Sequence, residues 1–475
     1  MEYEAVIGLE THVQLKTNSK MWCGCANEFG APANTHVCPV CLGLPGVLPV
    51  ANEEALRLTA LTGLLLNCSI SRYAKFDRKN YFYPDMPKNY QITQYDKPST
   101  LNGYVDFEFN GGLARVHITR AHLEEDVGKN FHFDRHSGID FNRAGVPLME
   151  IVSEPDLTSA DMAYEYLNAL KDILVYGGVS DCDMEKGMVR CDVNVSVRPK
   201  GQKELGAKIE IKNMNSFSGV RKALDYEIPR QIEVVKQGGK LTQSTRRWDD
   251  VAGITEEMRT KEHAHDYRYF PEPDLMPFEP TEPWLEEVSQ RVVELPLARK
   301  QRFIREYQLP PSDAQTFVWD VPLGDYFESF AHQAKNPKAL ANWVINNLRA
   351  KLAEAQVPLG QLKFQPPALI ELVGLVDSGK ISTRIAQEVF AEMFATGESP
   401  AKIVEKKGLA QVSDSGALEA FCDQAIAGNP GPVSDYRSGK AAALNFLKGQ
   451  VMKMSKGKAN PALVGEILER KLKAG

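Results

Sequence analysis

The chain has 475 residues, of which 43% are hydrophobic and 25% are charged, so we expect a globular protein with several domains. Its formal net charge of -6 excludes a protein that binds nucleic acid over its whole surface. The longest apolar runs fall short of the roughly twenty residues that a membrane-spanning helix requires, and the N-terminus has no signal-peptide character. We therefore expect no membrane contact and a cytoplasmic protein, in a bacterium or an archaeal or organellar equivalent.

The first predicted element is a strand over residues 4–16. Its apolar residues alternate with Gly8, Glu10, His12 and Gln14, which is the period of a half-buried strand. One face of this strand is therefore apolar, and the other carries groups that bind metals or exchange protons.

Four cysteines follow at close spacing: Cys23, Cys25, Cys38 and Cys41. Glycine and proline turns flank them, and the chain has no secretory signal, so a structural zinc site in loop 23–41 is the prediction. Two disulfides or four free thiols are the alternatives. Four thiolates would leave no open position for a catalytic water.

The next stretches alternate between helix and strand patterns. We expect a helix over residues 53–66, strands over 103–109, 113–120 and 148–152, and a helix that Thr158 caps and that ends at Gly177-Gly178. Between them lie a loop dense in tyrosine, asparagine and proline and the charged residues Lys79, Glu124 and Glu125, and Glu150 lies inside the strand over 148–152.

A hairpin of two strands, residues 189–197 and 207–213, has opposite charges on one face. An antiparallel sheet with its charged face in water would explain the same pattern. The polar residues of this face are Arg190, Asp192, Asn194 and Ser196 on the first strand and Lys208, Glu210 and Lys212 on the second.

The pattern is helical at residues 218–237, where Pro229 predicts a kink or two helices, and again from about residue 291 to the end. The last 38 residues contain eight lysines or arginines and two acidic residues. A basic face there would contact a phosphate backbone through Lys453, Lys456 and Lys458, although a solvated helical tail carries the same charges.

No phosphate-binding loop of the GxxxxGK[ST] or GxGxxG type is present. Nucleotide chemistry would therefore depend on side chains of the polar strand faces. Magnesium takes few protein carboxylates in addition to substrate phosphates, and lysine or arginine would neutralise the phosphate oxygens.

Several long strings of the chain are distinctive: IGLETHVQL at 7–15, FDRKNYFYPDMPKNYQITQYD at 76–96, HLEEDVGK at 122–129, FNRAGVPLMEIVSEPD at 141–156, RCDVNVSVRP at 190–199, IEIKNMNSF at 209–217, DYRYFPEPD at 266–274 and GKAAALNFLKGQVMKMSKGKANPALV at 439–464. These strings closely resemble the GatB family, the B subunits of the aspartyl/glutamyl-tRNA(Asn/Gln) amidotransferases, and the last string resembles its YqeY-like tail.

The resemblance implies an α+β fold: an antiparallel-sheet, cradle-shaped kinase and transamidase domain, an all-α helical domain and a small tail domain that binds tRNA. We place these domains at residues 1–290, 291–405 and 406–475. The implied reaction uses ATP to phosphorylate the side-chain carboxylate of Glu-tRNA(Gln) or Asp-tRNA(Asn). Ammonia then displaces the phosphate. The ammonia comes from glutamine, which an amidase-type glutaminase partner hydrolyses, and a small third protein completes a heterotrimer.

The resemblance also suggests roles for the polar residues. We assign catalysis to Glu10, Glu125, Glu150, Asp192 and Glu210, and magnesium binding to His12, Glu125 and Glu150. Phosphate binding is assigned to Lys79, Arg190, Lys208 and Lys212. A scaffold that binds tRNA and leaves all catalysis to its partners is the competing hypothesis.

Overall fold

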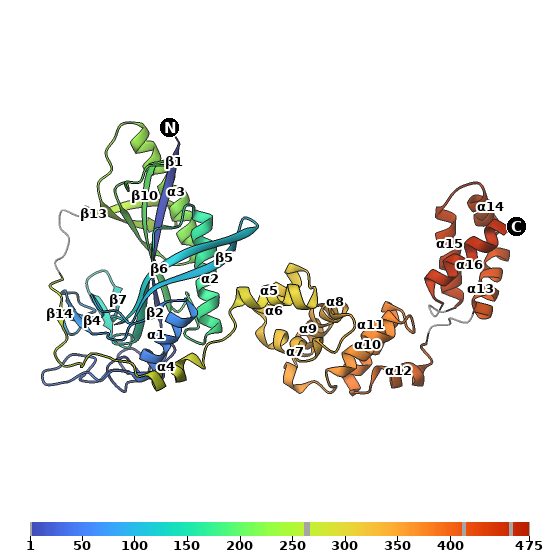
Figure 1. Cartoon of the computed structure of the whole chain (residues 1–475), viewed down its shortest axis with the longest axis horizontal. Coiled ribbons are helices and arrows are strands. Elements are labelled where there is room, and N and C mark those ends of the chain that lie inside the picture. Colours follow the sequence, from blue (N-terminus) through green and yellow to red (C-terminus); the bar gives the residue numbers. More distant parts are fainter. Residues whose placement is uncertain (1, 261–266, 411–414, 456–458, 475) are drawn as a thin grey trace. The chain divides into compact units, whose positions relative to one another are not determined.

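The computed structural model describes residues 2–260, 267–410, 415–455 and 459–474. The chain divides into two compact units, Met1–Leu297 and Ala298–Gly475 (Figure 1). The first unit contains the strands and helices α1 to α4, and the second is helical. The α+β fold class is therefore confirmed. The predicted boundaries after residues 290 and 405 stay predictions.

A nine-stranded sheet forms the frame of the first unit, in the order β13-β12-β11-β10-β1-β9-β6-β5-β2. Its neighbours pair antiparallel except β11 and β12, which are parallel. The strands are β1 (Tyr3–Gln14), β2 (Ser69–Ile70), β5 (Thr100–Phe109), β6 (Gly112–Glu125), β9 (Pro147–Ser153), β10 (Val189–Pro199), β11 (Ile209–Met214), β12 (Ser244–Asp249) and β13 (Ile254–Thr260).

Two smaller sheets accompany the large one. The three-stranded sheet has the order β14-β3-β4, and the two-stranded sheet pairs β7 with β8. Their strands are β3 (Asp77–Asn80), β4 (Tyr90–Thr93), β7 (Lys129–His132), β8 (Ser137–Asp140) and β14 (Phe270–Pro271).

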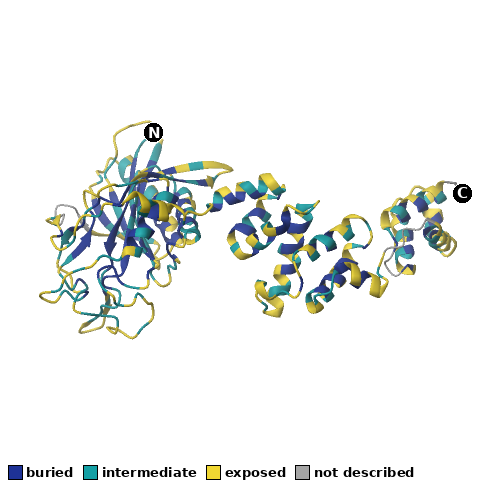
Figure 2. Cartoon of the chain, turned by 60° about the horizontal axis from the view of Figure 1, so that its bottom comes forward, coloured by how far each residue is buried: buried dark blue, intermediate teal, exposed yellow. Residues whose placement is uncertain are grey.

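One face of the large sheet carries the apolar core, because the two-residue period of each strand sends its Val, Ile and Leu side chains to the same side. Helices α1 (Glu53–Leu65), α2 (Ala160–Tyr176) and α3 (Phe217–Lys236) cover this face. Figure 2 shows how the buried residues concentrate in the sheet and on the inner sides of the helices. The other face carries the charged and polar side chains of the central strands, with apolar residues such as Leu148 and Val152 among them.

One predicted helix cap in this unit is wrong, and of the two alternatives at Pro229, a kink or two helices, the division into two helices is excluded. Ser159, not Thr158, caps α2, because its side chain accepts a hydrogen bond from the amide of Met162 at 3.1 Å. Pro229 lies inside the single helix α3 and does not divide it. Because proline has no backbone N–H, the carbonyl of Asp225 lacks its helical hydrogen-bond donor. Asp225 and Pro229 are both exposed, so water can donate to this carbonyl instead.

The second unit contains two separate apolar cores, one formed by residues 303–404 and one by residues 418–472. The last helix of the first unit is α4 (Glu282–Ser289). The helices that follow are α5 (Pro296–Tyr307), α6 (Pro311–Trp319), α7 (Val321–Ala331), α8 (Pro337–Asn342), η2 (Trp343–Leu348), α9 (Arg349–Ala355), η3 (Leu359–Gln361), α10 (Pro367–Asp377), α11 (Thr383–Thr396), α12 (Pro400–Lys407), α13 (Ser415–Ala427), α14 (Pro430–Arg437), α15 (Ala442–Met454) and α16 (Pro461–Ala474).

Across the described ranges, we find no helix that combines the length and the apolar character needed to cross a membrane.

Candidate functional site

The polar face of the large sheet brings the predicted site residues into rows across its central strands. Directly paired residues of antiparallel strands point to the same side. The first row therefore contains Arg190 of β10, His12 of β1, Glu150 of β9 and His122 of β6. In the next row, Asp192 of β10 lies beside Glu10 of β1.

His12, Glu124 and Glu150 form a compact cluster, whose three potential ligand atoms lie within 4.8 Å of one another. The Nε2 atom of His12 lies 3.6 Å from Glu124 Oε1 and 3.5 Å from Glu150 Oε2. His122 Nε2 lies 3.5 Å from Glu150 Oε2 on the other side. One imidazole nitrogen and two carboxylates form a donor set for a divalent cation, and the two carboxylates supply the oxygen ligands that Mg²⁺ prefers.

Burial and charge set the protonation of this cluster. Burial opposes the charge of His12, but the hydrogen bond to Glu150 and the nearby carboxylates raise the pKa of its imidazole. Burial lowers the pKa of His122 to about 4 and raises the pKa of Glu124. Burial also opposes ionisation of Glu150, but the two imidazoles lower its pKa. Glu150 is therefore the carboxylate most strongly held in the charged form.

Glu125 lies apart from this cluster, although the sequence suggested it as a magnesium ligand. The strand period turns Glu125 to the face opposite Glu124. Its carboxylate pairs with the ammonium group of Lys88 and accepts a hydrogen bond of 2.9 Å from the amide of Ile92. Glu124 therefore occupies the position next to His12 and Glu150 that we had assigned to Glu125.

A second group of charges continues along the polar face through β10 and β11. Lys212 forms ion pairs with Asp192 and, at 3.1 Å, with Glu210. Burial opposes its charge, but the two carboxylates raise the pKa of Lys212. Thr245 of β12 donates a hydrogen bond of 2.8 Å to Glu210. The structure thus joins these residues into one chain of alternating charges.

The remaining predicted cations lie in different surroundings. Burial opposes the charge of Lys79, but Glu124 and neighbouring groups raise its pKa, and its Nζ lies 5.0 Å from the ring centre of Tyr267. Arg190 donates to the buried Asp126 at 2.9 Å, and this carboxylate raises the pKa of the guanidinium. Lys208 lines the cavity described next. Lys79 and Arg190 thus both lie near enough to Glu124 for its charge to raise their pKa values, and Asp126 additionally anchors Arg190.

A cavity of about 240 Å³ adjoins Glu10 on the polar face. Asn194 forms part of its wall and donates a hydrogen bond of 2.8 Å to Glu10 Oε1. The other lining residues include Gly8, Pro155, Ser196, Leu205 and Lys208. This mixture of apolar and polar groups fits a small organic ligand beside the carboxylate row.

The four cysteines of the first loop converge, with sulfur atoms that all lie within 4.8 Å of one another. Hydrogen bonds from Cys23 lower the pKa of Cys41 to about 4, and the amide of Cys38 donates to Cys41 Sγ at 3.1 Å. All four are free thiols. Because thiolates are the ligands that structural zinc prefers, this donor set fits Zn²⁺.

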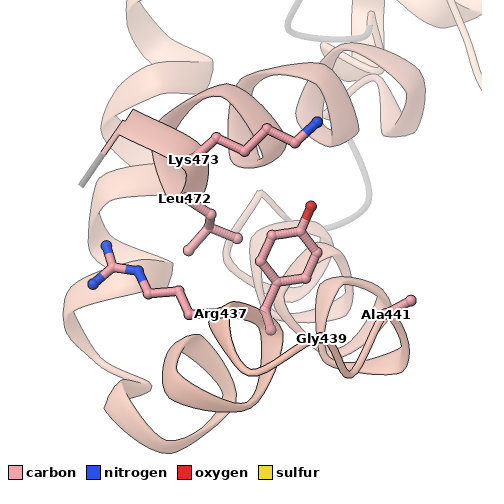
Figure 3. Close-up of a pocket in the computed structure, with 6 residues that line it drawn as sticks. Arg437, Gly439, Ala441, Leu472 and Lys473 are labelled. Carbon is pink, nitrogen blue, oxygen red and sulfur yellow. The ribbon is translucent and has the colours of Figure 1, made fainter.

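The tail holds the predicted RNA-binding lysines and a shallow pocket. Lys453 is exposed near the end of α15, and Lys456 and Lys458 lie outside the described residues. A pocket of about 440 Å³ lies among Tyr436, Arg437, Gly439, Ala441, Leu472 and Lys473 (Figure 3). Its cationic and aromatic side chains are of the kinds that contact RNA.

Two family models match the chain. The GatB/GatE catalytic domain matches residues 5–286, and the GatB domain matches residues 325–472. The chain belongs to the GatB/GatE family. The resemblance seen in the sequence is thereby confirmed.

Curated relatives of this GatB/GatE chain are similar over its full length. The aspartyl/glutamyl-tRNA(Asn/Gln) amidotransferase B subunit of Carboxydothermus hydrogenoformans is 53% identical, over 99% of both chains. The protein of the same name from a Thermoanaerobacter strain is 52% identical over 99% of this chain and 100% of the relative, and that of Persephonella marina is 50% identical over 100% of both.

The sequence reasoning missed several residues of this GatB/GatE site. His122, Asp126 and Lys88 all lie in strings that carry the family resemblance, but none of them was assigned a role. The two-residue period of a strand could have identified Glu124, because residues two apart lie on the same face and His122 therefore shares its face with Glu124 and not with Glu125. We had ended the predicted strand near residue 120, whereas β6 continues to Glu125.

Proposed function

We propose that the chain is the kinase and transamidase component of a glutamine-dependent tRNA amidotransferase, a ligase that forms a carbon-nitrogen bond. The substrates are Glu-tRNA(Gln), Asp-tRNA(Asn) or both. The cluster of His12, Glu124 and Glu150, flanked by Lys79 in the domain that matches the family's catalytic model, carries the proposal.

The reaction has two steps. A side-chain carboxylate oxygen of the aminoacyl group attacks the γ-phosphorus of ATP, and ADP leaves with the electrons of the broken P–O bond. Ammonia then attacks the acyl carbon, phosphate leaves, and a base takes the extra proton from nitrogen. A free carboxylate is a poor electrophile for ammonia, so the acyl phosphate supplies the leaving group.

His12, Glu124 and Glu150 would hold Mg²⁺, which would neutralise charge on the phosphates. Lys79 would contact phosphate oxygens from the side of Glu124. Glu150, whose pKa is lowered, would remain a charged ligand.

The cavity beside Glu10 supports a place for the nucleoside of ATP. It lies on the same face as the cluster, and Glu10 pairs with Asp192 in the adjacent row. Lys208 at its edge and Lys212 between Asp192 and Glu210 would then orient phosphates or the aminoacyl group. Arg190 would act less directly, through Asp126.

The proposed assembly is a heterotrimer of this chain, an amidase-type glutaminase and a small third protein, and ammonia would pass from the glutaminase to this chain through a channel. The tail would bind tRNA. Zinc at Cys23, Cys25, Cys38 and Cys41 would be structural, and a cytoplasmic location follows from the place of translation.

The experiment measures acyl-phosphate formation in a single turnover by the reconstituted complex, with labelled ATP and Glu-tRNA(Gln) or Asp-tRNA(Asn). We expect Glu150→Gln to reduce the rate at least a hundredfold while tRNA binding persists. Glu154→Gln is the control, because Glu154 lies just after the same strand but is exposed, and its carboxylate accepts a hydrogen bond from Thr119 at 2.6 Å.

The competing scaffold hypothesis predicts a different result. If all catalysis belonged to the partners, Glu150→Gln and Glu154→Gln would form acyl phosphate at equal rates. That outcome would refute the catalytic role of the cluster.

A further inference from the structure

Lys20 is a completely buried lysine beside the cysteine site. Its side chain is 0% exposed, and its Nζ lies 3.7 Å from Cys41 Sγ and donates at 3.2 Å to the carbonyl of Phe141. Lysine is almost never fully buried without a compensating charge, because removal of an ammonium group from water is costly. The surroundings of Lys20 therefore have to contain a negative group.

Carboxylates do not supply that group. Within the described part of the chain, no aspartate or glutamate forms an ion pair with Lys20. The nearest anionic candidate is the sulfur of Cys41. Four thiolates around one divalent cation leave an excess of negative charge, so an ammonium group at this position would stabilise the loaded site.

We propose that Lys20 is the positioning residue of the cysteine metal site, where its buried ammonium group holds the Cys41 thiolate and ties it to the turn at Phe141. The inference rests on the zinc site of the proposed function. In structural metal sites, residues that hold the ligands contribute to affinity together with the ligands themselves.

The turn that contains Phe141 and Gly145 packs closely against Lys20 and Cys41. Gly145 has a φ of +85°, and the amide of Met21 donates to its carbonyl at 2.7 Å. The position of a Cβ atom at Gly145 would lie 3.5 Å from Cys41 Cβ, 3.6 Å from Lys20 Cδ and 3.9 Å from Glu125 Oε2. The metal site, Lys20 and the end of β6 are therefore packed around one residue.

The test measures how fast zinc leaves the full-length protein in excess chelator, with a colorimetric zinc indicator. Lys20→Met keeps the approximate volume of the side chain and removes its charge. We expect this variant to release zinc about ten to a hundred times faster than the wild type. Lys16→Met is the matched control, because Lys16 is exposed and pairs with Asp181 at 2.7 Å, and its release rate should stay within about twofold.

A second readout separates a charge effect from a loss of packing. With cobalt in place of zinc, the thiolate-to-metal charge-transfer band should move to lower energy in Lys20→Met, because the sulfur electrons are no longer stabilised by the ammonium group. Lys20→Arg, which keeps the positive charge, should retain the wild-type band. Identical cobalt spectra and equal zinc release in wild type and Lys20→Met would overturn the proposal.

A double variant keeps the proposal falsifiable if Lys20→Met alone folds poorly. Cys41→Ser removes the thiolate and leaves Lys20 buried without its partner, so Lys20→Met added to Cys41→Ser should restore soluble protein and raise its thermal midpoint. If the double variant is no more stable than Cys41→Ser, the pairing is refuted. A wild-type protein that takes up no zinc would overturn the metal site as well, whereas acyl-phosphate formation tests the proposed function separately.

Discussion

Glu124 and Glu125 are neighbours in the chain, and their replacement by glutamine should change different properties of the protein. Glu125 is 3% exposed, and the Lys88 ammonium with which it pairs has a side chain that is 9% exposed. Glu125→Gln removes the charge that compensates Lys88. Loss of one partner of a buried ion pair costs about 3–5 kcal/mol. Because glutamine still accepts a hydrogen bond from Ile92, we expect a loss at the low end of this range.

Glu124→Gln should cost little stability. The one ion pair of Glu124 among the described residues joins it to His12 at 3.6 Å, and burial raises the pKa of its carboxyl. A raised pKa means that the fold disfavours the charged form, so stability falls as the pH rises from the ordinary glutamate value through the folded pKa. The neutral glutamine avoids this penalty. We expect a change in unfolding free energy below about 1 kcal/mol at pH 7.

Two assays separate these effects. Urea unfolding followed by tryptophan fluorescence gives the stability of each variant, and single-turnover acyl-phosphate formation in the assembled complex gives the chemistry. Glu124→Gln should lose at least a hundredfold in rate with stability nearly unchanged. The double variant Glu125→Gln with Lys88→Met should recover stability, because both buried charges are then absent. Equal destabilisation by Glu124→Gln and Glu125→Gln would refute the assignment of the two faces.

Three further predictions concern other charged groups. Burial opposes ionisation of Glu227, but hydrogen bonds from Arg230 and other donors lower its pKa, so its stabilisation is complete above the ordinary glutamate pKa and is lost as the pH falls through the lower folded value. Glu227→Gln should thus cost about 3 kcal/mol at pH 7 and less near pH 3 in urea unfolding. Lys453→Ala should weaken tRNA binding severalfold in filter binding and reduce its salt dependence by about one counterion. Lys212→Met should leave Asp192 without its ion pair and slow acyl-phosphate formation at least tenfold, with the KM for tRNA unchanged.

Much of the fold could be predicted because local signals and long-range packing agree. Helix α2 ends at Tyr176, next to the Gly177-Gly178 pair at which the sequence predicts its end. The two-residue period located β1, β10 and β11. In contrast, the order of the nine strands could not be predicted, because it depends on pairing between segments as distant as β1 and β10.

The site could be predicted in composition but less well in geometry. His12 and Glu150 were identified from their strand faces, and the structure brings them together. The partners of Glu125 and Cys41 were not predicted, because Lys88 and Lys20 lie in loops, where the sequence has no periodic pattern that indicates the direction of a side chain. Contacts of this kind depend on tertiary packing, which a single sequence does not specify locally.

The pairing of β10 with β11 explains how one ammonium group contacts two carboxylates. Val193 pairs with Ile211 but Cys191 pairs with Met214, so β11 has one extra residue opposite Asp192. Asn213, at this bulge, has a φ of +72°, a conformation that asparagine tolerates better than most residues. Continued by one residue, the regular register of Asn194 with Glu210 and of Val193 with Ile211 sets Lys212 opposite Asp192. The two-residue period places Lys212 and Glu210 on the same face of β11, so one ammonium group reaches both carboxylates. The extra residue comes directly after Lys212, so the ladder becomes irregular only beyond the charged pair.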